Sequence, residues 1–210
     1  MPTESPPRKI VIATGNAHKT QEFRDLLGTA WQVEDLRDHP ELPIPEETGT
    51  TFAENAATKA LSASRALGPG FLVVADDSGL EVDALNGAPG VTSARYAGPA
   101  ATDADNRAKL LAALAAAGAR GPARRGRFRC VLVVARGGEI LGSCDGTVEG
   151  ILGNEEQGQG GFGYDSLFIP DGYGETFGQL PASVKHSLSH RGCAARKLPP
   201  ILEKYAPVGA

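Results

Sequence analysis

The sequence predicts an α/β protein with a mixed β-sheet and helices on its faces. In the first half of the chain, short apolar runs typical of strands alternate with helical patterns. In the second half, two apolar stretches flank a Gly-Gly pair, which indicates a β-hairpin. Leu, Ile, Val and Phe make up 22% of the 210 residues, so the chain lies above the ~20% level below which chains tend to be disordered.

The chain is expected to begin with a strand, a loop and a helix. Residues 9–14 contain three consecutive aliphatic side chains and predict a short buried strand. The helical pattern that follows ends at Gly28, where a C-terminal cap glycine belongs. A second short strand and a loop rich in proline and glutamate are expected within residues 31–51. A further strand over 71–75 ends in two aspartates.

Two capping boxes mark the starts of further helices. Thr51 with Glu54 opens a helix that runs to Gly68. Thr102 with Asp105 opens a second helix, which is rich in the alanine and leucine residues that favour helices.

The second half of the chain predicts a hairpin, a strand and a helical tail. Strands within residues 127–150 meet at Gly137-Gly138. Another strand is expected over 164–170. Residues 189–205 are helical in pattern, and Pro199-Pro200 should kink or split that helix because proline has no main-chain donor.

The chain shows no internal repeat and no clear linker. Residues 1–7 are polar and rich in proline, so we expect a disordered tail followed by one domain over residues 8–206. The basic stretch 118–127 is expected to be a solvated connection.

Charge and composition exclude several classes of protein. A formal net charge of −4 and a pI near 5.6 argue against binding to a nucleic acid polymer. No apolar run approaches 18 residues, so we expect no membrane span, and the N-terminus lacks the apolar core of a secretory signal. Three cysteines outside any CxxC pair predict neither a zinc site nor a disulfide framework, and a cytoplasmic location is expected.

The segment from Thr14 to Lys19 lies between a predicted strand and a predicted helix start. Main-chain N–H groups at a helix start, with a lysine one turn in, form an anion-binding site. The segment lacks the second glycine of a Walker A loop. Two interpretations stay open here: a phosphate-binding loop, or an ordinary β–α turn with a surface lysine.

Two adjacent carboxylates, Asp76 and Asp77, follow the strand predicted over 71–75. Ligands of open α/β sheets bind at the carboxyl ends of strands, and Mg²⁺ prefers one or two carboxylates plus substrate phosphates. We therefore favour a metal or substrate site over an Asx turn. Glu47 is either a second metal ligand or a solvated loop acid, whereas Glu54 has a sufficient role in its capping box.

Residues Gly158–Gly163 match the pattern G-x-G-x-x-G, but the context for dinucleotide binding fails. The motif follows a polar loop and leads into a predicted strand, whereas a dinucleotide site needs a strand before it and a helix after it. Phe162 is placed to stack on a base, and Asp165 to accept hydrogen bonds from the edge of the base. The alternative is a glycine-rich turn with Phe162 in the core.

Lys185, His190 and Arg191 lie near the start of the predicted C-terminal helix. Their side chains can donate hydrogen bonds to an anion or to a carbonyl oxygen. The alternative is the ordinary polarity of a helix start. The chain has no G-x-S-x-G elbow, so a serine nucleophile is not indicated.

The motifs occur in a distinctive order along the chain. The segments are Ala13-Thr14-Gly15-Asn16 with Lys19, Glu47-Thr48-Gly49, Thr51-Phe52 with Glu54-Asn55-Ala56 and Lys59, Ala75–Leu80, Gly87–Val91 with Ser93–Tyr96, Gly160–Asp165 and Ser189–Gly192. Together they resemble the inosine/xanthosine triphosphate pyrophosphatase family, and the resemblance covers residues 9–205.

The resemblance implies a fold and a reaction. The fold would be an elongated mixed β-sheet flanked by helices, with two lobes that enclose a nucleotide cleft, in a homodimer. The reaction would be the Mg²⁺-dependent hydrolysis of ITP, dITP and XTP to the monophosphate and pyrophosphate, which removes deaminated purines from the nucleotide pool. Mn²⁺ is the expected substitute for Mg²⁺.

The resemblance also implies roles for individual residues. Glu47 and Asp77 would hold the metal, and Asp77 would be the catalytic proton acceptor. The implied substrate-binding residues are Thr14, Gly15, Asn16, Ala17, His18, Lys19, Lys59, Ser78, Phe162, Gly163, Tyr164, Asp165, Lys185, His190 and Arg191. Of these, Thr14–Lys19 would bind the triphosphate, Lys59 and Ser78 would touch the nucleotide, and the residues from Phe162 onward would frame the base.

Two other classes of function stay open. A nucleotide-binding sensor would keep the loops but would not need paired carboxylates. A dinucleotide oxidoreductase is suggested only by the misplaced glycine motif. Release of pyrophosphate from dITP in the presence of Mg²⁺ distinguishes all three.

Overall fold

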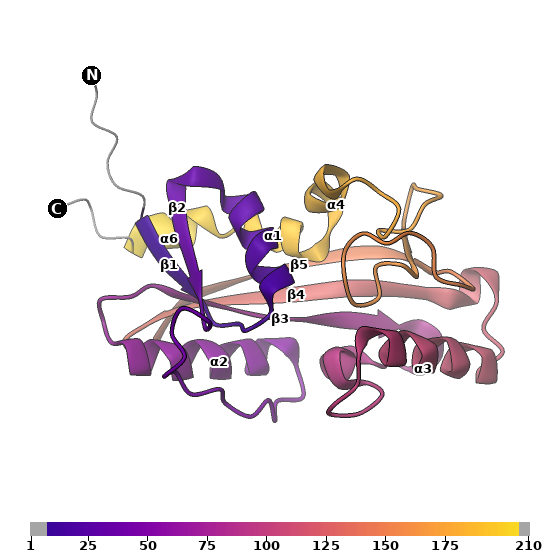
Figure 1. The fold of residues 1–210 in the computed structure, drawn as a ribbon, viewed down its shortest axis with the longest axis horizontal. Coiled ribbons are helices and arrows are strands. Elements are labelled where there is room, and N and C mark those ends of the chain that lie inside the picture. The colour runs from indigo at the N-terminus through magenta and orange to yellow at the C-terminus, as the bar shows by residue number, and fades with distance from the viewer. Residues whose placement is uncertain (1–7, 206–210) are drawn as a thin grey trace, which may run out of the picture. The chain divides into compact units, whose positions relative to one another are not determined.

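The computed structural model describes residues 8–205, and Figure 1 shows its fold. The predicted disordered tail, residues 1–7, lies outside the described residues. The helices are α1 (Ala17–Leu27), α2 (Phe52–Leu67), α3 (Asp103–Ala116), α4 (Ala182–Leu188), α5 (His190–Ala195) and α6 (Pro199–Tyr205). The strands are β1 (Arg8–Ile12), β2 (Trp31–Asp35), β3 (Val73–Val82), β4 (Arg125–Arg136), β5 (Glu139–Leu152) and β6 (Phe168–Pro170).

The six strands form one mixed sheet in the order β2-β1-β3-β4-β5-β6. Strand β1 pairs in parallel with β2 and with β3, whereas β5 and β6 are antiparallel. β4 and β5 are joined by Gly137 and Gly138, both at positive φ (56° and 87°), as a tight hairpin turn requires. The predicted α/β class and mixed sheet are therefore confirmed.

The described residues divide into two compact units. The first unit comprises 8–77, 131–145 and 194–205, and the second comprises 78–130 and 146–193. The single domain that the sequence predicts over 8–206 stays a prediction. Within residues 8–205, no helix combines the length and the hydrophobicity that crossing a membrane would require.

The first unit packs α2 closely against its strands. Ala56, Ala60 and Ala63 recur at helical spacing and are buried against residues such as Val73 and Ala75 of β3. Because alanine side chains are small, the helix axis comes near the sheet. Helix α2 lies on one face of the parallel strands and α1 on the other (Figure 1).

The second unit has a larger, aromatic core. Its buried residues come from β3, α3, β4 and the segment 164–177, which contains β6; they include Leu80, Leu110, Leu114, Phe128, Tyr164, Phe168 and Phe177. Phe128 packs on Phe168 with ring centroids 4.7 Å apart. Leu110 and Leu114 of α3 lie one turn apart, so α3 buries a single apolar face in this core.

The predicted helix ends agree with the structure. Both capping boxes form in full, at Thr51 with Glu54 and at Thr102 with Asp105. Gly28 follows α1 with φ 64°, a conformation that favours glycine. The helical tail is split as expected: α5 ends at Ala195, and α6 begins at Pro199, because a first helical turn tolerates proline.

Several elements differ from the prediction. The strand expected over 164–170 is confined to Phe168–Pro170, because turns that return to Tyr164 O fill the preceding residues. Helix α4 was not predicted. The solvated connection expected over 118–127 is wrong at its C-terminal end, where β4 begins at Arg125 and alternate arginines pair with acids: Arg125 with Asp171 at 2.8 Å and Arg127 with Glu149 at 2.9 Å.

Asp35, at the end of β2, is a buried carboxylate with close donors. Thr20 Oγ1 donates to its Oδ2 at 2.6 Å, and Arg37 Nε donates to the same oxygen at 3.0 Å. Burial alone would raise the pKa of Asp35, but these donors and the charge of Arg37 outweigh burial and hold it at about 2, below the ordinary value of 3.8.

This lowered pKa predicts a specific loss of stability in acid. The ionised Asp35 contributes stability above its unfolded pKa, and that contribution, at most about 2.5 kcal/mol, is lost as the pH falls from about 4 through about 2. In Asp35→Asn, the free energy of unfolding measured by urea titration should fall less over this interval than in the wild type. Asp25→Asn, a matched change at an exposed position of α1, should keep the wild-type slope. Equal slopes in Asp35→Asn and the wild type would contradict the prediction.

Candidate functional site

The carboxyl ends of β1 and β2 meet beside the two aspartates of β3. Ile12, the last residue of β1, is in register with Val74 on one side and with Asp35 on the other. Asp76 and Asp77 follow Val74 by two and three residues, so they lie just beyond this edge of the parallel strands. This is the position where open α/β sheets bind ligands.

The prediction that the strand ends at residue 75 is wrong. Strand β3 continues to Val82, because it keeps β4 as a neighbour after β1 ends at Ile12. Asp76 and Asp77 therefore lie within a strand. Successive side chains of a strand point to opposite faces of the sheet, so these two carboxylates do not form a pair.

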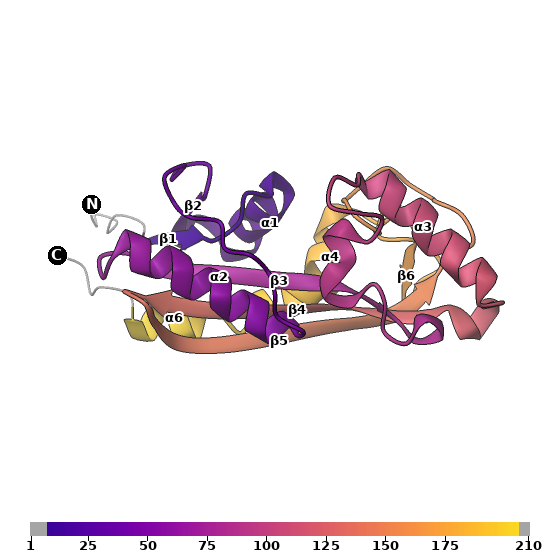
Figure 2. The same ribbon diagram turned by 90° about the horizontal axis from the view of Figure 1, so that it is seen from below.

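Each aspartate meets a lysine from the helix on its own face. Lys19 Nζ of α1 contacts Asp76 Oδ1. Lys59 Nζ of α2 donates to Asp77 Oδ1 at 2.6 Å and to Glu47 Oε1 at 3.0 Å. Figures 1 and 2 show α1 and α2 on the two sides of β3. Glu47 and Asp77 are thus brought together around one cation, while Asp76 lies on the opposite face.

Burial and charge shift the pKa values of this cluster. Burial raises the pKa of the Asp77 carboxyl, although the charge of Lys59 opposes the shift. Burial would lower the pKa of Lys59, but the charges of Asp77 and Glu47 outweigh it and raise that pKa. Lys59 therefore stays charged, and Asp77 is a stronger base than an exposed aspartate.

Asn55 is a member of this cluster to which no role was assigned from the sequence. Its side chain is fully buried; Oδ1 accepts from Gly49 N at 2.8 Å, and Nδ2 donates to Asp77 Oδ2 at 3.4 Å. A side chain at Gly49 would lie 2.6 Å from Asn55 Oδ1, so only glycine fits. Asn55 links the loop that carries Glu47 to Asp77. Its polar side chain, one turn before Lys59 on α2, was the available signal.

The segment Thr14–Lys19 forms a tight turn into α1. Asn16 is the N-cap, and its Oδ1 accepts from His18 N at 2.9 Å and from Lys19 N at 3.2 Å. Thr14 Oγ1 accepts from Asn16 N at 3.1 Å. The residues of the turn from Gly15 to His18 are exposed, so the predicted anion-binding segment is accessible next to the Lys19 ammonium.

A second cluster lies in the second unit, around Phe162. Lys185 Nζ lies 4.9 Å from the centre of its ring, and the Arg191 guanidinium lies 5.8 Å from it. Asp165 Oδ2 accepts from Lys185 Nζ at 2.6 Å and from Phe162 N at 2.8 Å. The structure therefore gathers four of the residues predicted to frame a base.

The remaining predicted residues of this unit are placed as follows. Ser78 Oγ accepts from Arg191 Nη2 at 2.9 Å. The His190 ring is stacked on Phe128 with centroids 4.8 Å apart. Tyr164 is buried in the core, and its hydroxyl donates to Ser93 O at 2.8 Å, so its side chain serves the packing of this unit.

The structure supports the interpretation that Gly158–Gly163 does not form a dinucleotide-binding site. No helix or strand lies within residues 153–167, so the strand–turn–helix context of a dinucleotide site is missing in this described segment. Gly158 has φ 81°, and a side chain there would lie 2.2 Å from the Gly178 carbonyl. The glycines of this segment thus allow close contact between two loops.

The donor set of the first cluster fits a hard divalent cation. Glu47 and Asp77 already present oxygens around a single positive group, the Lys59 ammonium. Within residues 8–205, no group of three or more His, Cys, Asp or Glu residues forms a complete cage. Mg²⁺ is commonly held by one or two carboxylates together with substrate phosphates, so these two residues match its needs.

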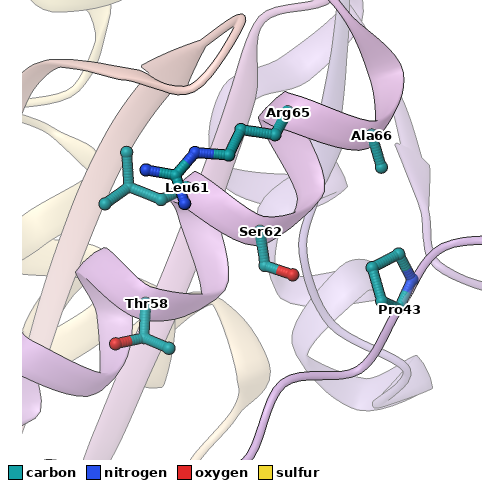
Figure 3. Close-up of a pocket in the computed structure, with 6 residues that line it drawn as sticks. All are labelled: Pro43, Thr58, Leu61, Ser62, Arg65 and Ala66. Atoms are coloured by element: carbon teal, nitrogen blue, oxygen red, sulfur yellow. The ribbon is translucent and has the colours of Figure 1, made fainter.

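A surface cavity of about 530 Å³ lies on the outer side of α2 and contains none of the predicted site residues. Figure 3 shows its lining: Pro43, Thr58, Leu61, Ser62, Arg65 and Ala66. Five of these residues lie on the side of α2 opposite the buried alanines, and neither Asn55 nor Lys59 lines the cavity. The cavity is therefore separate from the carboxylate cluster.

Comparisons with known proteins give a consistent result. The model of the Ham1 family matches residues 10–201. A dITP/XTP pyrophosphatase of Methylococcus capsulatus is 48% identical over 193 residues, which cover 91% of this chain and 94% of that protein. One of Streptococcus agalactiae is 47% identical over 197 residues, and this chain spans about 60% of its length and 93% of its own. A solved HAM1 protein of Coxiella burnetii has a TM-score of 0.82 at 38% identity, with 94% of this chain and 99% of that chain covered.

Proposed function

The chain belongs to the Ham1 family, and we propose that it hydrolyses deaminated purine nucleoside triphosphates, namely ITP, dITP and XTP, to the monophosphate and pyrophosphate. The relatives from Methylococcus capsulatus and Streptococcus agalactiae are named dITP/XTP pyrophosphatases. The observation that carries the proposal is the arrangement of Glu47 and Asp77 around Lys59, with Lys19 close enough for its charge to act on Asp77. The biological role would be to clear deaminated purines from the nucleotide pool.

The first cluster supplies the groups that hydrolysis needs. Attack of water at the α-phosphorus requires a group that takes the proton of the water, and positive charge near the departing pyrophosphate. Asp77 accepts that proton on its carboxylate. Lys19 and Lys59 provide positive charge near the phosphates. Mg²⁺, held by Glu47 and Asp77, supplies Lewis-acid stabilisation of the phosphate oxygens when it is bound.

The second cluster supplies recognition of the base. Phe162 offers an aromatic surface, and Lys185 and Arg191 place donors beside it. Hypoxanthine and xanthine carry an oxygen at position 6, which accepts hydrogen bonds, whereas adenine carries an amino group there. Arginine and lysine can only donate, so such a site favours hypoxanthine and xanthine over adenine.

The expected homodimer and the expected cytoplasmic location stay predictions. Neither is needed for the assay that tests the reaction.

The purified chain should release pyrophosphate and IMP from ITP in the presence of Mg²⁺. EDTA should abolish turnover, and added Mg²⁺ or Mn²⁺ should restore it, because the ligand set consists of oxygen atoms. Glu47→Gln should raise the Mg²⁺ concentration needed for half-maximal activity, whereas Glu46→Gln, the same change at the exposed neighbouring residue, should leave it unchanged. Binding of ITP without turnover would identify a sensor, and full activity in metal-free buffer would contradict the metal assignment.

A further inference from the structure

The loop between β5 and β6 carries Phe162 and Gly163 without any regular secondary structure of its own. Its conformation therefore depends on contacts with neighbouring elements. On one side, Gly160 N donates to Gly178 O at 2.9 Å. The other side faces α3, a helix to which the sequence assigned no functional residue.

Two side chains of α3 hold both main-chain groups of Gly163. Gly163 N donates to Asp103 Oδ2 at 2.7 Å, and Arg107 Nη1 donates to Gly163 O at 2.8 Å. Asp103 and Arg107 are four residues apart on α3, so they lie one above the other on the same face. Arg107 Nε also lies 2.8 Å from Glu156 Oε2, at a second point of the same loop.

These contacts determine the position of Phe162. The N–H and C=O groups of Gly163 are both hydrogen-bonded to α3, so the peptide planes on both sides of Gly163 are fixed. Gly163 itself has φ 61°. Phe162 N is held independently by Asp165 Oδ2 at 2.8 Å. The ring that faces Lys185 and Arg191 is therefore attached to a backbone fixed at consecutive residues.

We propose that Asp103 and Arg107 are positioning residues that set how the loop at Phe162 and Gly163 receives a purine base. This α3 clamp, defined as Asp103 and Arg107, acts through the main chain of Gly163. It keeps the Phe162 ring at a fixed position relative to Lys185 and Arg191, and so contributes to the discrimination between bases. The inference rests on the proposed function for its substrate class, but the clamp itself rests on the contacts with Gly163 and Glu156.

Two variants with opposite changes of charge test the clamp. Arg107→Gln removes a positive charge, and Asp103→Ala removes a negative one together with the oxygen that accepts from Gly163 N. An electrostatic effect on the anionic nucleotide would change KM in opposite directions, whereas loss of the clamp should raise the KM for ITP by about 5- to 30-fold in both. The ratio of kcat/KM for ITP to that for ATP should fall in both, with kcat changed much less than KM. Because both residues hold Gly163, the double variant should be less affected than the product of the two single effects predicts.

Hydrogen–deuterium exchange of the peptide that covers residues 156–166 gives a readout that does not depend on turnover. Exchange should be faster in both single variants, and Arg107→Lys should restore part of the protection and part of the KM. The matched control is Lys109→Gln, because Lys109 contacts Tyr96 O and not the loop. Unchanged exchange, opposite shifts of KM, or an equal effect of Lys109→Gln would overturn the clamp. If the variants lose protection but the wild type does not turn over ITP, the proposed function is wrong and the clamp is still supported.

Discussion

Asp77→Asn is expected to lower kcat for ITP by roughly 10²- to 10⁴-fold, the range for loss of a positioned acid–base group. The substitution keeps the shape of the side chain but removes its charge, its affinity for a metal and its capacity to accept a proton. Folding should survive because Lys59 keeps Glu47 as a partner at 3.0 Å, so no buried ammonium is left unpaired. Steady-state kinetics at saturating ITP and Mg²⁺, with thermal unfolding in parallel, measure both effects.

Asp76→Asn is the matched control for this prediction, because it makes the same change one residue earlier on the opposite face of β3. Asp76 contacts Lys19 at the start of α1. Its loss should release that lysine and raise the KM for ITP, with a much smaller fall in kcat than in Asp77→Asn. If the two variants lose kcat equally, the two faces of the strand do not have separate roles. A folded Asp77→Asn that turns over normally would show that Asp77 is not the proton acceptor.

Features determined by a few neighbouring residues could be predicted from the sequence. The capping boxes at Thr51 and Thr102 and the glycine after α1 depend on residues within one helical turn, and all three are present. The hairpin at Gly137-Gly138 depends on the only residue type that readily adopts two consecutive positive φ angles. Local chemistry therefore determined where these elements begin and end.

The length of β3 and the placement of its two aspartates on opposite faces could not be predicted in the same way. An apolar run followed by Asp-Asp indicates the end of a strand, but β3 continues because β4, some fifty residues later, remains its neighbour. That continuation places Asp76 and Asp77 on opposite faces. The prediction that Asp77 acts together with Glu47 rested on the family resemblance, because the contact of both residues with Lys59 depends on the packing of α2.

Residues that act through other residues gave the weakest signal. Asn55 and Arg107 lie within helical patterns that explain them fully as ordinary helix positions. Their partners, Asp77 and Gly163, are 22 and 56 residues away in the sequence. Only the packing of each helix within its own unit shows that these side chains hold a functional segment.

Arg191→Ala is expected to lower kcat/KM for ITP far more than for ATP, so that the ratio between the two substrates shrinks. The guanidinium of Arg191 lies beside the Phe162 ring and can only donate hydrogen bonds. Oxygen at position 6 of hypoxanthine accepts such a bond, whereas the amino group of adenine would leave a buried donor unpaired, at a cost of ~1–3 kcal/mol for each group. Sites built on such hydrogen bonds discriminate by up to about 10⁴-fold or more.

The contact between Arg191 and Ser78 adds a test that separates base recognition from folding. Arg191 is 1% exposed, so truncation to alanine also removes packing, and thermal unfolding must accompany the kinetics. Ser78→Ala keeps the arginine but removes the oxygen that orients its Nη2 at 2.9 Å. It should therefore shrink the ITP-to-ATP ratio in the same direction by a smaller factor, with little loss of stability. If activity falls equally for both substrates in the two variants, Arg191 serves the phosphates or the fold, and base choice must be assigned to Lys185 and Phe162.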